Sequence, residues 1–233
     1  MSLKTNQSPY LVNYGDSSIL IQYKLPGDTH YSQDVNNAVN TLAQSLRKSK
    51  NWTEVVPAYD SLLCSFDISR MTLETAKTTI KRRIKDVKAK PKSTPNIIEI
   101  PVAYGGDYGP DIEAIQKTSK LSQQALIDLH CKKSYDVCML GFIPGFAFLS
   151  EAPKALHHPR HATPRSLVPA GSIGIAGWQT GIYGLESPGG WQIIGRTPLK
   201  LFYKFKDDPF LVKAGDKIQF VPIKAKFFDE LST

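Results

Sequence analysis

The sequence predicts an α+β protein in which a ferredoxin-like α/β sandwich is followed by a second domain of short strands, either a barrel or a sandwich. Three observations support this fold class. Short β-type runs alternate with two amphipathic helical stretches in the first 90 residues. A proline- and lysine-rich stretch follows at residues 88–96, and short β-type runs rich in glycine dominate after Tyr135. Since 233 residues can bury two modest cores, we expect domains at residues 8–90 and 96–233.

The N-terminal domain is predicted from the order of its elements. A helix over residues 32–48 carries its apolar residues on one face and begins at Ser32, a good N-cap. A second helix over residues 73–87 has Thr72 as its candidate cap. The β-type runs lie at residues 10–14, 18–23, 54–59, 62–67 and 97–102. A ferredoxin-like sandwich fits this order, which is strand, helix, two strands and helix. The strand near residue 97 would complete it.

Residues 88–96 hold three lysines and two prolines and little that could be buried, so they are predicted to link the domains. The second domain should open with the strand at 97–102 and a turn at 104–107. A helix should begin at residues 109–111, and another should cover residues 122–131. Its predicted strands lie at residues 97–102, 136–142, 172–176, 181–183, 191–194, 199–205 and 217–222.

The glycine-rich segment, residues 163–198, is the most unusual part of the chain. It holds 8 of the 16 glycines and 4 of the 16 prolines but only three charged residues, Arg165, Glu186 and Arg196. Glycine weakens regular structure, so this density predicts tight turns, bulges or backbone that another group approaches closely. Short apolar runs between the glycines are typical of a barrel or sandwich.

Composition excludes several classes of protein. No apolar run is long enough to span a membrane, and the first residues lack the apolar core of a signal peptide. Three cysteines make no even disulfide framework, so we expect reduced thiols and a cytoplasmic location. The net charge of +8 concentrates near the end of the second helix. Without an aromatic platform, that charge favours a solvated face or an acidic protein partner over nucleic acid.

Motifs for nucleotide or metal chemistry are missing from the sequence. The stretch from Gly171 to Gly177 lacks the lysine of a phosphate-binding loop, and there is no Cys-x-x-Cys pair or nucleophile elbow. His157, His158 and His161 are close enough in sequence to ligate zinc, but a proline separates two of them and no cysteine stands at ligand spacing. We therefore expect a polar loop and no metal in this chain.

Three arginines, Arg160, Arg165 and Arg196, are the candidate binding residues for an anion, because a guanidinium grips a carboxylate with two parallel hydrogen bonds. Gln179, Thr180 and Tyr183 are candidates for holding an amide or carbonyl group. The alternative for these residues is structural: arginines that pin turns through backbone carbonyls, and a polar network at the mouth of the barrel. Phe142, Phe146, Phe148, Trp178 and Trp191 are expected to serve the core.

Five pieces of the second half carry a family resemblance. They are YGGDYGPD (104–111), GFIPGFAFL (141–149), PRSLVPAGSIGIAG (164–177), QTGIY (179–183) and SPGGWQIIGRTP (187–198). The chain resembles the carboxyltransferase-like family that contains the B subunit of bacterial 5-oxoprolinase, the first subunit of allophanate hydrolase and the KipI-like inhibitors of a histidine kinase. This resemblance implies a cyclophilin-like β-barrel for the second domain, without implying prolyl isomerisation.

The resemblance implies a non-autonomous subunit of an ATP-dependent 5-oxoprolinase. Such an enzyme opens 5-oxo-L-proline to L-glutamate, and this chain would work in it with the A and C subunits. The ATP site is expected in one of these partners, and the arginines would then bind the carboxylate of 5-oxoproline. Two alternatives stay open, a protein inhibitor of a sensor histidine kinase and a component of an allophanate hydrolase or urea carboxylase. Nucleic acid and membrane partners are not expected.

Overall fold

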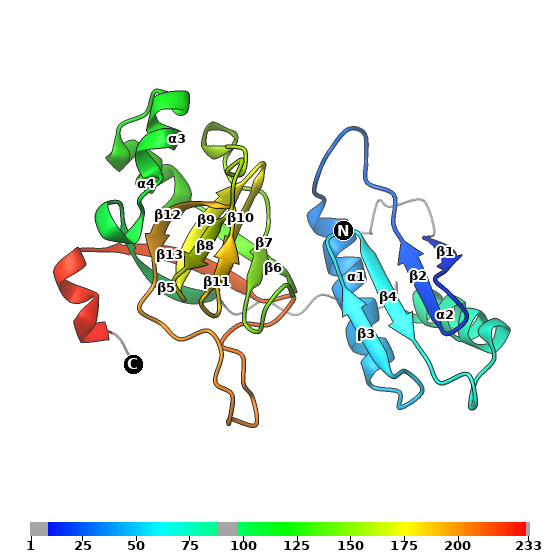
Figure 1. Ribbon diagram of the computed structural model, residues 1–233. Helices are drawn as coiled ribbons and strands as arrows, with labels where there is room; N and C mark the ends of the chain where they lie inside the picture. The colour runs from blue at the N-terminus through cyan, green and yellow to red at the C-terminus, as the bar shows by residue number, and fades with distance from the viewer. Residues whose placement is uncertain (1–8, 88–96, 232–233) are drawn as a thin grey trace. The chain divides into compact units, whose positions relative to one another are not determined.

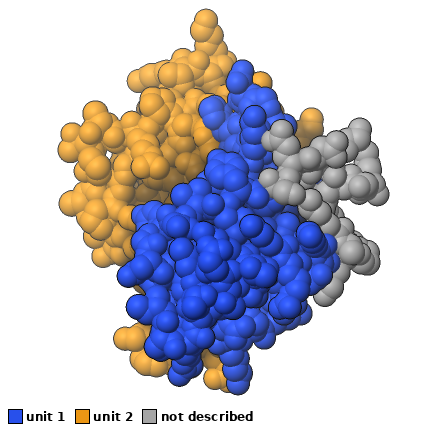
Figure 2. Space-filling model, turned by 90° about the vertical axis from the view of Figure 1, so that its right-hand side faces the viewer, with its two compact units in different colours: residues 1–94 blue, residues 95–233 orange. Residues whose placement is uncertain are grey.

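The computed structural model describes residues 9–87 and 97–231. The chain divides into two compact units, Met1–Thr94 and Pro95–Thr233, which Figure 2 colours separately. The predicted linker at residues 88–96 lies outside the described residues. In the described part of the chain, no helix is both long and apolar enough to cross a membrane.

The first unit is a four-stranded antiparallel sheet with two helices (Figure 1). Its strands are β1 (Tyr10–Asn13), β2 (Ser18–Gln22), β3 (Glu54–Pro57) and β4 (Ser61–Ser65), in the spatial order β1-β2-β4-β3. Alternate residues of β2 and β4, among them Ile19, Ile21, Leu62 and Cys64, are fully buried. One face of the sheet therefore forms the core with the helices.

Both helices begin at the caps that the sequence predicts. Helix α1 (Gln33–Arg47) starts after Ser32, whose hydroxyl accepts a hydrogen bond from the Val35 amide at 3.4 Å. Helix α2 (Leu73–Val87) starts after Thr72, whose hydroxyl accepts from the Thr75 amide at 3.2 Å. These hydroxyls satisfy amides that have no partner within the helix, so each fixes where its helix begins.

The strand expected to complete this sheet belongs to the other unit. In the predicted ferredoxin-like sheet, the strand that follows the second helix would lie beside β2. Here that place is taken by β1, which precedes β2 in the chain. The stretch from residue 97 is β5 (Ile97–Tyr104), and it pairs with strands of the barrel. A hairpin between β1 and β2 closes over a short Gly15 turn, so the edge of the sheet is filled locally.

The second unit is a closed seven-stranded barrel in the order β10-β7-β6-β13-β5-β12-β9. Its strands are β5, β6 (Ser134–Leu140), β7 (Ala147–Leu149), β9 (Ser172–Ala176), β10 (Gln179–Ile182), β12 (Gln192–Arg196) and β13 (Lys217–Ile223). Strands β5 and β13 pair in parallel, and the other pairs of the barrel are antiparallel. Closure removes the exposed edges that an open sheet would present.

Outside the barrel lie two helices and a two-stranded ribbon. Helix α3 (Ile112–Ser119) follows Asp111, and helix α4 (Gln123–Cys131) is capped by Ser122. Both add apolar residues, such as Ile115 and Leu126, to the main core of the barrel. The ribbon pairs β8 (Arg165–Val168) with β11 (Ser187–Gly189).

The predicted strand at residues 199–205 is wrong. That stretch forms one arm of a hairpin with a single bridge between Phe202 and Phe210. The chain turns back at Tyr203–Lys206, and Pro209 has no amide hydrogen to extend a ladder. The very short strands β7, β8 and β11 were not among the strands that the sequence predicts.

The glycines of the 163–198 segment let aromatic rings lie directly on the barrel wall. Along β9, Ile173 and Ile175 belong to the main core, whereas a Cβ added at Gly174 would lie 2.9 Å from the Cβ of Trp191. On β10, a Cβ at Gly181 would lie 3.2 Å from the rings of Phe146 and Trp191. The predicted close approach is thus made by the protein's own side chains, which form a second core with Tyr183.

Candidate functional site

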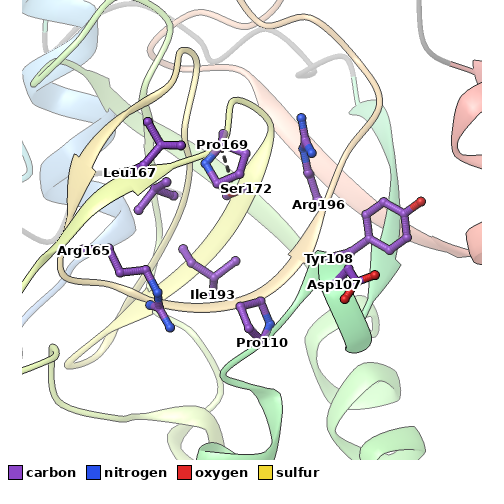
Figure 3. Close-up of a pocket in the computed structure, with 10 residues that line it drawn as sticks. Asp107, Tyr108, Pro110, Arg165, Leu167, Pro169, Ser172, Ile193 and Arg196 are labelled. Carbon is purple, nitrogen blue, oxygen red and sulfur yellow. Dashed lines mark hydrogen bonds between the residues drawn. The ribbon is translucent and has the colours of Figure 1, made fainter.

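One pocket of about 180 Å³ lies on the barrel unit beside the glycine-rich segment (Figure 3). Apolar side chains from β8 and β12, two cations and an acid contribute to its lining. Its lining comprises Asp107, Tyr108, Pro110, Arg165, Leu167, Val168, Pro169, Ser172, Ile193 and Arg196. Half of these residues are polar or charged, so the pocket offers groups that could orient a small polar ligand. Two of the predicted arginines, Arg165 and Arg196, therefore share one pocket.

The guanidinium of Arg165 is held by a buried carboxylate. Its two Nη atoms donate to the two oxygens of Asp111, at 2.8 and 2.6 Å. The Ile193 amide also donates to Asp111, at 2.6 Å, and the Nε2 of His161 lies 3.2 Å from the same oxygen. Asp111 thereby ties the start of α3 to β8 and β12, which are far away in sequence.

Burial by itself would raise the pKa of Asp111. The hydrogen bonds from Arg165, the Ile193 amide and His161, together with the charge of Arg165, outweigh burial and hold the pKa of this carboxyl below its usual value. Asp111 is therefore a stable anion at neutral pH. Because both Nη atoms of Arg165 are engaged by it, the geometry gives Arg165 a positioning role at the pocket.

Arg196 is held only at one nitrogen. Its Nε donates to the carbonyl of Ala170 at 2.9 Å, and its guanidinium lies 5.5 Å from the centre of the Phe228 ring. The Nη atoms of Arg196 make no hydrogen bond to another residue in the parts of the chain described here. Figure 3 shows Arg165 and Arg196 on opposite sides of Ile193. Arg196 is thus the lining cation with donors left for a ligand.

Arg160 and Tyr183 belong to an aromatic cluster instead of the pocket. The Arg160 guanidinium lies 5.7 Å from the centre of the Trp191 ring, a cation–π distance. Tyr183 is buried in the second core against Phe146. Burial raises the pKa of Tyr183, although the Trp191 amide and the charges of Arg160 and Arg165 act against it.

Thr180 is fully buried in the barrel wall. Its hydroxyl donates to the Gly174 carbonyl at 3.0 Å and lies 3.2 Å from the Nε2 of His130. His130 is fully buried as well, and its Nδ1 lies 2.7 Å from the Tyr104 hydroxyl. Burial, assisted by the charge of Lys133, lowers the pKa of His130 to about 3, so the ring is neutral. Gln179, at the start of β10, is half-buried.

The structure separates the three histidines into different contacts. The Nε2 of His157 lies 2.9 Å from the Ala152 carbonyl, and the backbone of His158 bridges Gly177. His161 faces Arg165 and Asp111. Within residues 9–87 and 97–231, no group of three His, Cys, Asp or Glu side chains is placed to hold a metal ion.

The aromatic side chains divide between core and surface. Phe146 and Trp191 are buried in the second core, and Phe148 packs against it. Phe142 is 67% exposed, with its ring at right angles to that of Phe146. Its φ of +69° and the hydrogen bond from the Ile143 amide to the Gly141 carbonyl place it in a γ-turn.

Sequence reasoning missed four polar residues of the pocket region: Asp107, Tyr108, Asp111 and Ser172. Three of them lie in the stretch 104–111, which carries part of the family resemblance. The sequence does show two acids, Asp107 and Asp111, in that stretch, and carboxylates are strong partners for arginine side chains. The pairing itself joins residues 54 positions apart, and no local pattern encodes it.

Comparison with known proteins shows which family this chain belongs to. Residues 9–212 match the family model described as the carboxyltransferase domain, subdomain C and D. The chain belongs to this carboxyltransferase family. It is 38% identical over 224 residues to the B subunit of 5-oxoprolinase from Bacillus subtilis, covering 91% of this chain and 92% of that protein.

A second family member, the B subunit of 5-oxoprolinase from Escherichia coli O157:H7, is 39% identical over 216 residues, which cover 92% of this chain and 95% of that protein. Among solved structures, TTHA0988 aligns with a TM-score of 0.78 and 32% identity over 89% of this chain. The chain spans 40% of the length of TTHA0988. The carboxyltransferase family therefore accounts for the mixed α/β architecture and the closed barrel.

Proposed function

We propose that this chain is the non-autonomous B subunit of an ATP-dependent 5-oxoprolinase, which converts 5-oxo-L-proline to L-glutamate together with the A and C subunits. One observation carries the proposal. Two family members that are named as the B subunit of 5-oxoprolinase align with this chain over more than nine tenths of both sequences, at 38% and 39% identity.

The reaction explains why several subunits would be needed. A lactam is a stable amide, and opening it to the amino acid is uphill unless it is coupled to ATP. Transfer of the γ-phosphoryl group of ATP to the lactam oxygen would make the ring carbon electrophilic. ADP leaves in that transfer. One water then adds to the ring carbon and the carbon–nitrogen bond breaks, which leaves γ-glutamyl phosphate, and a second water hydrolyses this acyl phosphate to glutamate and phosphate. In this scheme the barrel contributes to the substrate site, and a partner contributes the nucleotide site.

The residues of this chain do not fit a phosphate-binding loop. The stretch from Gly171 to Gly177 lacks a lysine, and Gly174 within it is covered by Trp191. A nucleotide phosphate needs free backbone amides and a cation at such a loop. This supports placing the ATP site in a partner subunit.

The pocket beside the glycine-rich segment is the proposed place of substrate contact. Arg196 would meet the carboxylate of 5-oxoproline through its Nη atoms, while Asp111 fixes Arg165 at the opposite side. Arg160, Gln179, Thr180 and Tyr183 do not line this pocket. Their proposed part in binding is indirect, through the wall formed by β9, β10 and Trp191.

The experiment compares Arg196→Lys with Arg165→Lys in a reconstituted complex of all three subunits. Lysine keeps the charge but loses the planar fork, so Arg196→Lys should reduce kcat/KM for 5-oxoproline by about 10-fold or more at a nearly unchanged Tm. Arg165→Lys should lower the Tm, because it breaks the paired bonds to Asp111. If Arg196→Lys lowers the Tm and leaves kcat/KM unchanged, Arg196 belongs to the scaffold alone.

A further inference from the structure

The segment that follows β13, residues 224–231, contains one buried side chain. The segment forms two short helical turns, Ala225–Phe227 and Asp229–Leu231, and is coloured red in Figure 1. Phe228 is 7% exposed, whereas its neighbour Phe227 is 39% exposed and the other residues of the segment are exposed as well. Among residues 224–231, Phe228 is therefore the one that is buried in the barrel unit.

Phe228 contacts two residues that line the pocket. The centre of its ring lies 4.5 Å from the ring centre of Tyr108 and 5.5 Å from the guanidinium carbon of Arg196. Arg196 is the last residue of β12, and Tyr108 ends the short turn Gly106–Tyr108. Figure 3 shows both residues on the side of Ile193 away from Arg165. Phe228 thus lies against the part of the pocket that holds the free donors of Arg196.

The two arginines of the pocket are restrained in different ways. Asp111 takes up both Nη atoms of Arg165 and offsets its charge. For Arg196 the Ala170 carbonyl takes up only Nε, and a single hydrogen bond offsets little of the rotamer entropy of an arginine. An aromatic ring attracts a cation but has no acceptor oxygen and no negative charge. The contact with Phe228 can therefore restrain Arg196 without neutralising it.

We propose that Phe228 is a positioning residue for the carboxylate site of the pocket. It fixes the orientation of the Arg196 guanidinium, so that the Nη atoms are ready to meet the carboxylate of 5-oxoproline. Donors that are oriented beforehand lose less entropy when the ligand binds. The inference rests on the proposed function for the identity of the ligand. If Phe228 only anchored the segment, an aliphatic side chain of similar size would serve equally well.

The kinetic test uses the reconstituted complex of all three subunits. Phe228→Leu keeps an apolar anchor and removes the ring, whereas Phe228→Tyr keeps the ring. Phe228→Leu should raise KM for 5-oxoproline about 5-fold or more and leave kcat within about 2-fold, because a contact with a carboxylate that does not react is made equally in the ground state and the transition state. Phe228→Tyr should retain the wild-type KM. Phe227→Leu makes the same change one residue earlier and should leave KM unchanged.

A double-mutant cycle tests whether Phe228 acts through Arg196. Arg196→Ala leaves no guanidinium to orient, so Phe228→Leu should cause no further rise of KM in that background. The same rise in both backgrounds would overturn the inference, as would equal KM values for Phe228→Leu and the wild-type chain. Equal losses in Phe228→Leu and Phe228→Tyr would also overturn it, because the aromatic ring would then have no special part.

A measurement on the isolated full-length chain separates this inference from the proposed function. The Nε–H signal of Arg196, assigned by its loss in Arg196→Lys, reports the fast motion of the guanidinium through NMR relaxation. Its order parameter should be high in the wild-type chain and in Phe228→Tyr and should fall in Phe228→Leu. Equal order in all three would overturn the positioning role. A complex in which Phe228 restrains Arg196 but which hydrolyses no 5-oxoproline would contradict the proposed function and leave the positioning of Arg196 standing.

Discussion

Asp111 is the carboxylate that joins the start of α3 to two distant strands, and its partners make it a stabilising anion. Asp111→Asn removes the charge that Arg165 faces and places amide hydrogens against two existing donors. We expect the free energy of unfolding to fall by about 1–3 kcal/mol, measured by urea denaturation. The control is Asp107→Asn, an exposed acid four residues earlier, which should change stability by less than about 0.5 kcal/mol. Equal stability of the Asp111 variant and the wild type would show that the charge of Asp111 in its pair with Arg165 does not stabilise the fold.

His130 gives the barrel a predictable dependence on pH. Since the pKa of His130 is lowered from 6.5 to about 3, the unfolded chain binds a proton between these values and the folded chain does not. The stability from the neutral ring is fully present above about pH 6.5 and is lost as the pH falls toward 3, at about 1.4 kcal/mol per pH unit.

His130→Gln removes this titration while keeping a polar side chain near Tyr104 and Thr180. Between pH 7 and pH 5, the wild-type chain should lose about 2 kcal/mol more unfolding free energy than the variant. The variant should be less stable at pH 7 but should show a flatter profile. Parallel profiles for the two proteins would show that His130 is accessible to protons in the folded state.

Single residues differ in how far the sequence predicts them. Ser32 and Thr72 could be assigned as caps because a cap acts on amides three residues away. Arg196, a candidate binding residue from the sequence, lines the pocket, but the partner of Arg165 was out of reach of local reasoning. Its carboxylate lies on another element, and only the closure of the barrel brings the two together.

At the level of elements, strand β9 depends on a residue without a side chain. Gly174→Ala would place a Cβ 2.9 Å from the Cβ of Trp191, closer than real contacts allow, so the aromatic layer must shift. We expect a loss of about 1–3 kcal/mol of unfolding free energy. Gly190→Ala is the matched control in the same segment, since the nearest atoms to its Cβ would lie 3.7 Å away. Equal unfolding free energies for the two variants would show that the layer over β9 is loosely packed.

The longer elements could be predicted because they carry a clear period. Helix α2 covers the predicted residues 73–87, and β9 covers the predicted 172–176. Strands β7 and β11 have only three residues each, too few for an alternation to be recognised. The hairpin at 201–211 resembles a strand in composition, but its lysines and aspartates lie at an exposed turn.

At the scale of the whole molecule, the sequence predicts the fold class but not every assignment of strands. Each unit has its own core. The order of helices and strands was enough to indicate a ferredoxin-like sheet, whereas the family resemblance was needed to choose a barrel over a sandwich. Strand β5 was expected to complete the sheet as well as to open the barrel. Its parallel pairing with β13, more than 100 residues later, has no local signal, and β1 fills the place beside β2.

The central claim is that this chain acts only as part of a multisubunit 5-oxoprolinase. The most direct measurement follows glutamate and ADP release from 5-oxo-L-proline and ATP, with the purified chain alone, with the A and C subunits alone, and with all three together. We predict no turnover by the chain alone, little or none by the other two without it, and coupled release of glutamate and ADP by the three together. Turnover by the isolated chain, or full activity of the A and C subunits in its absence, would contradict the account.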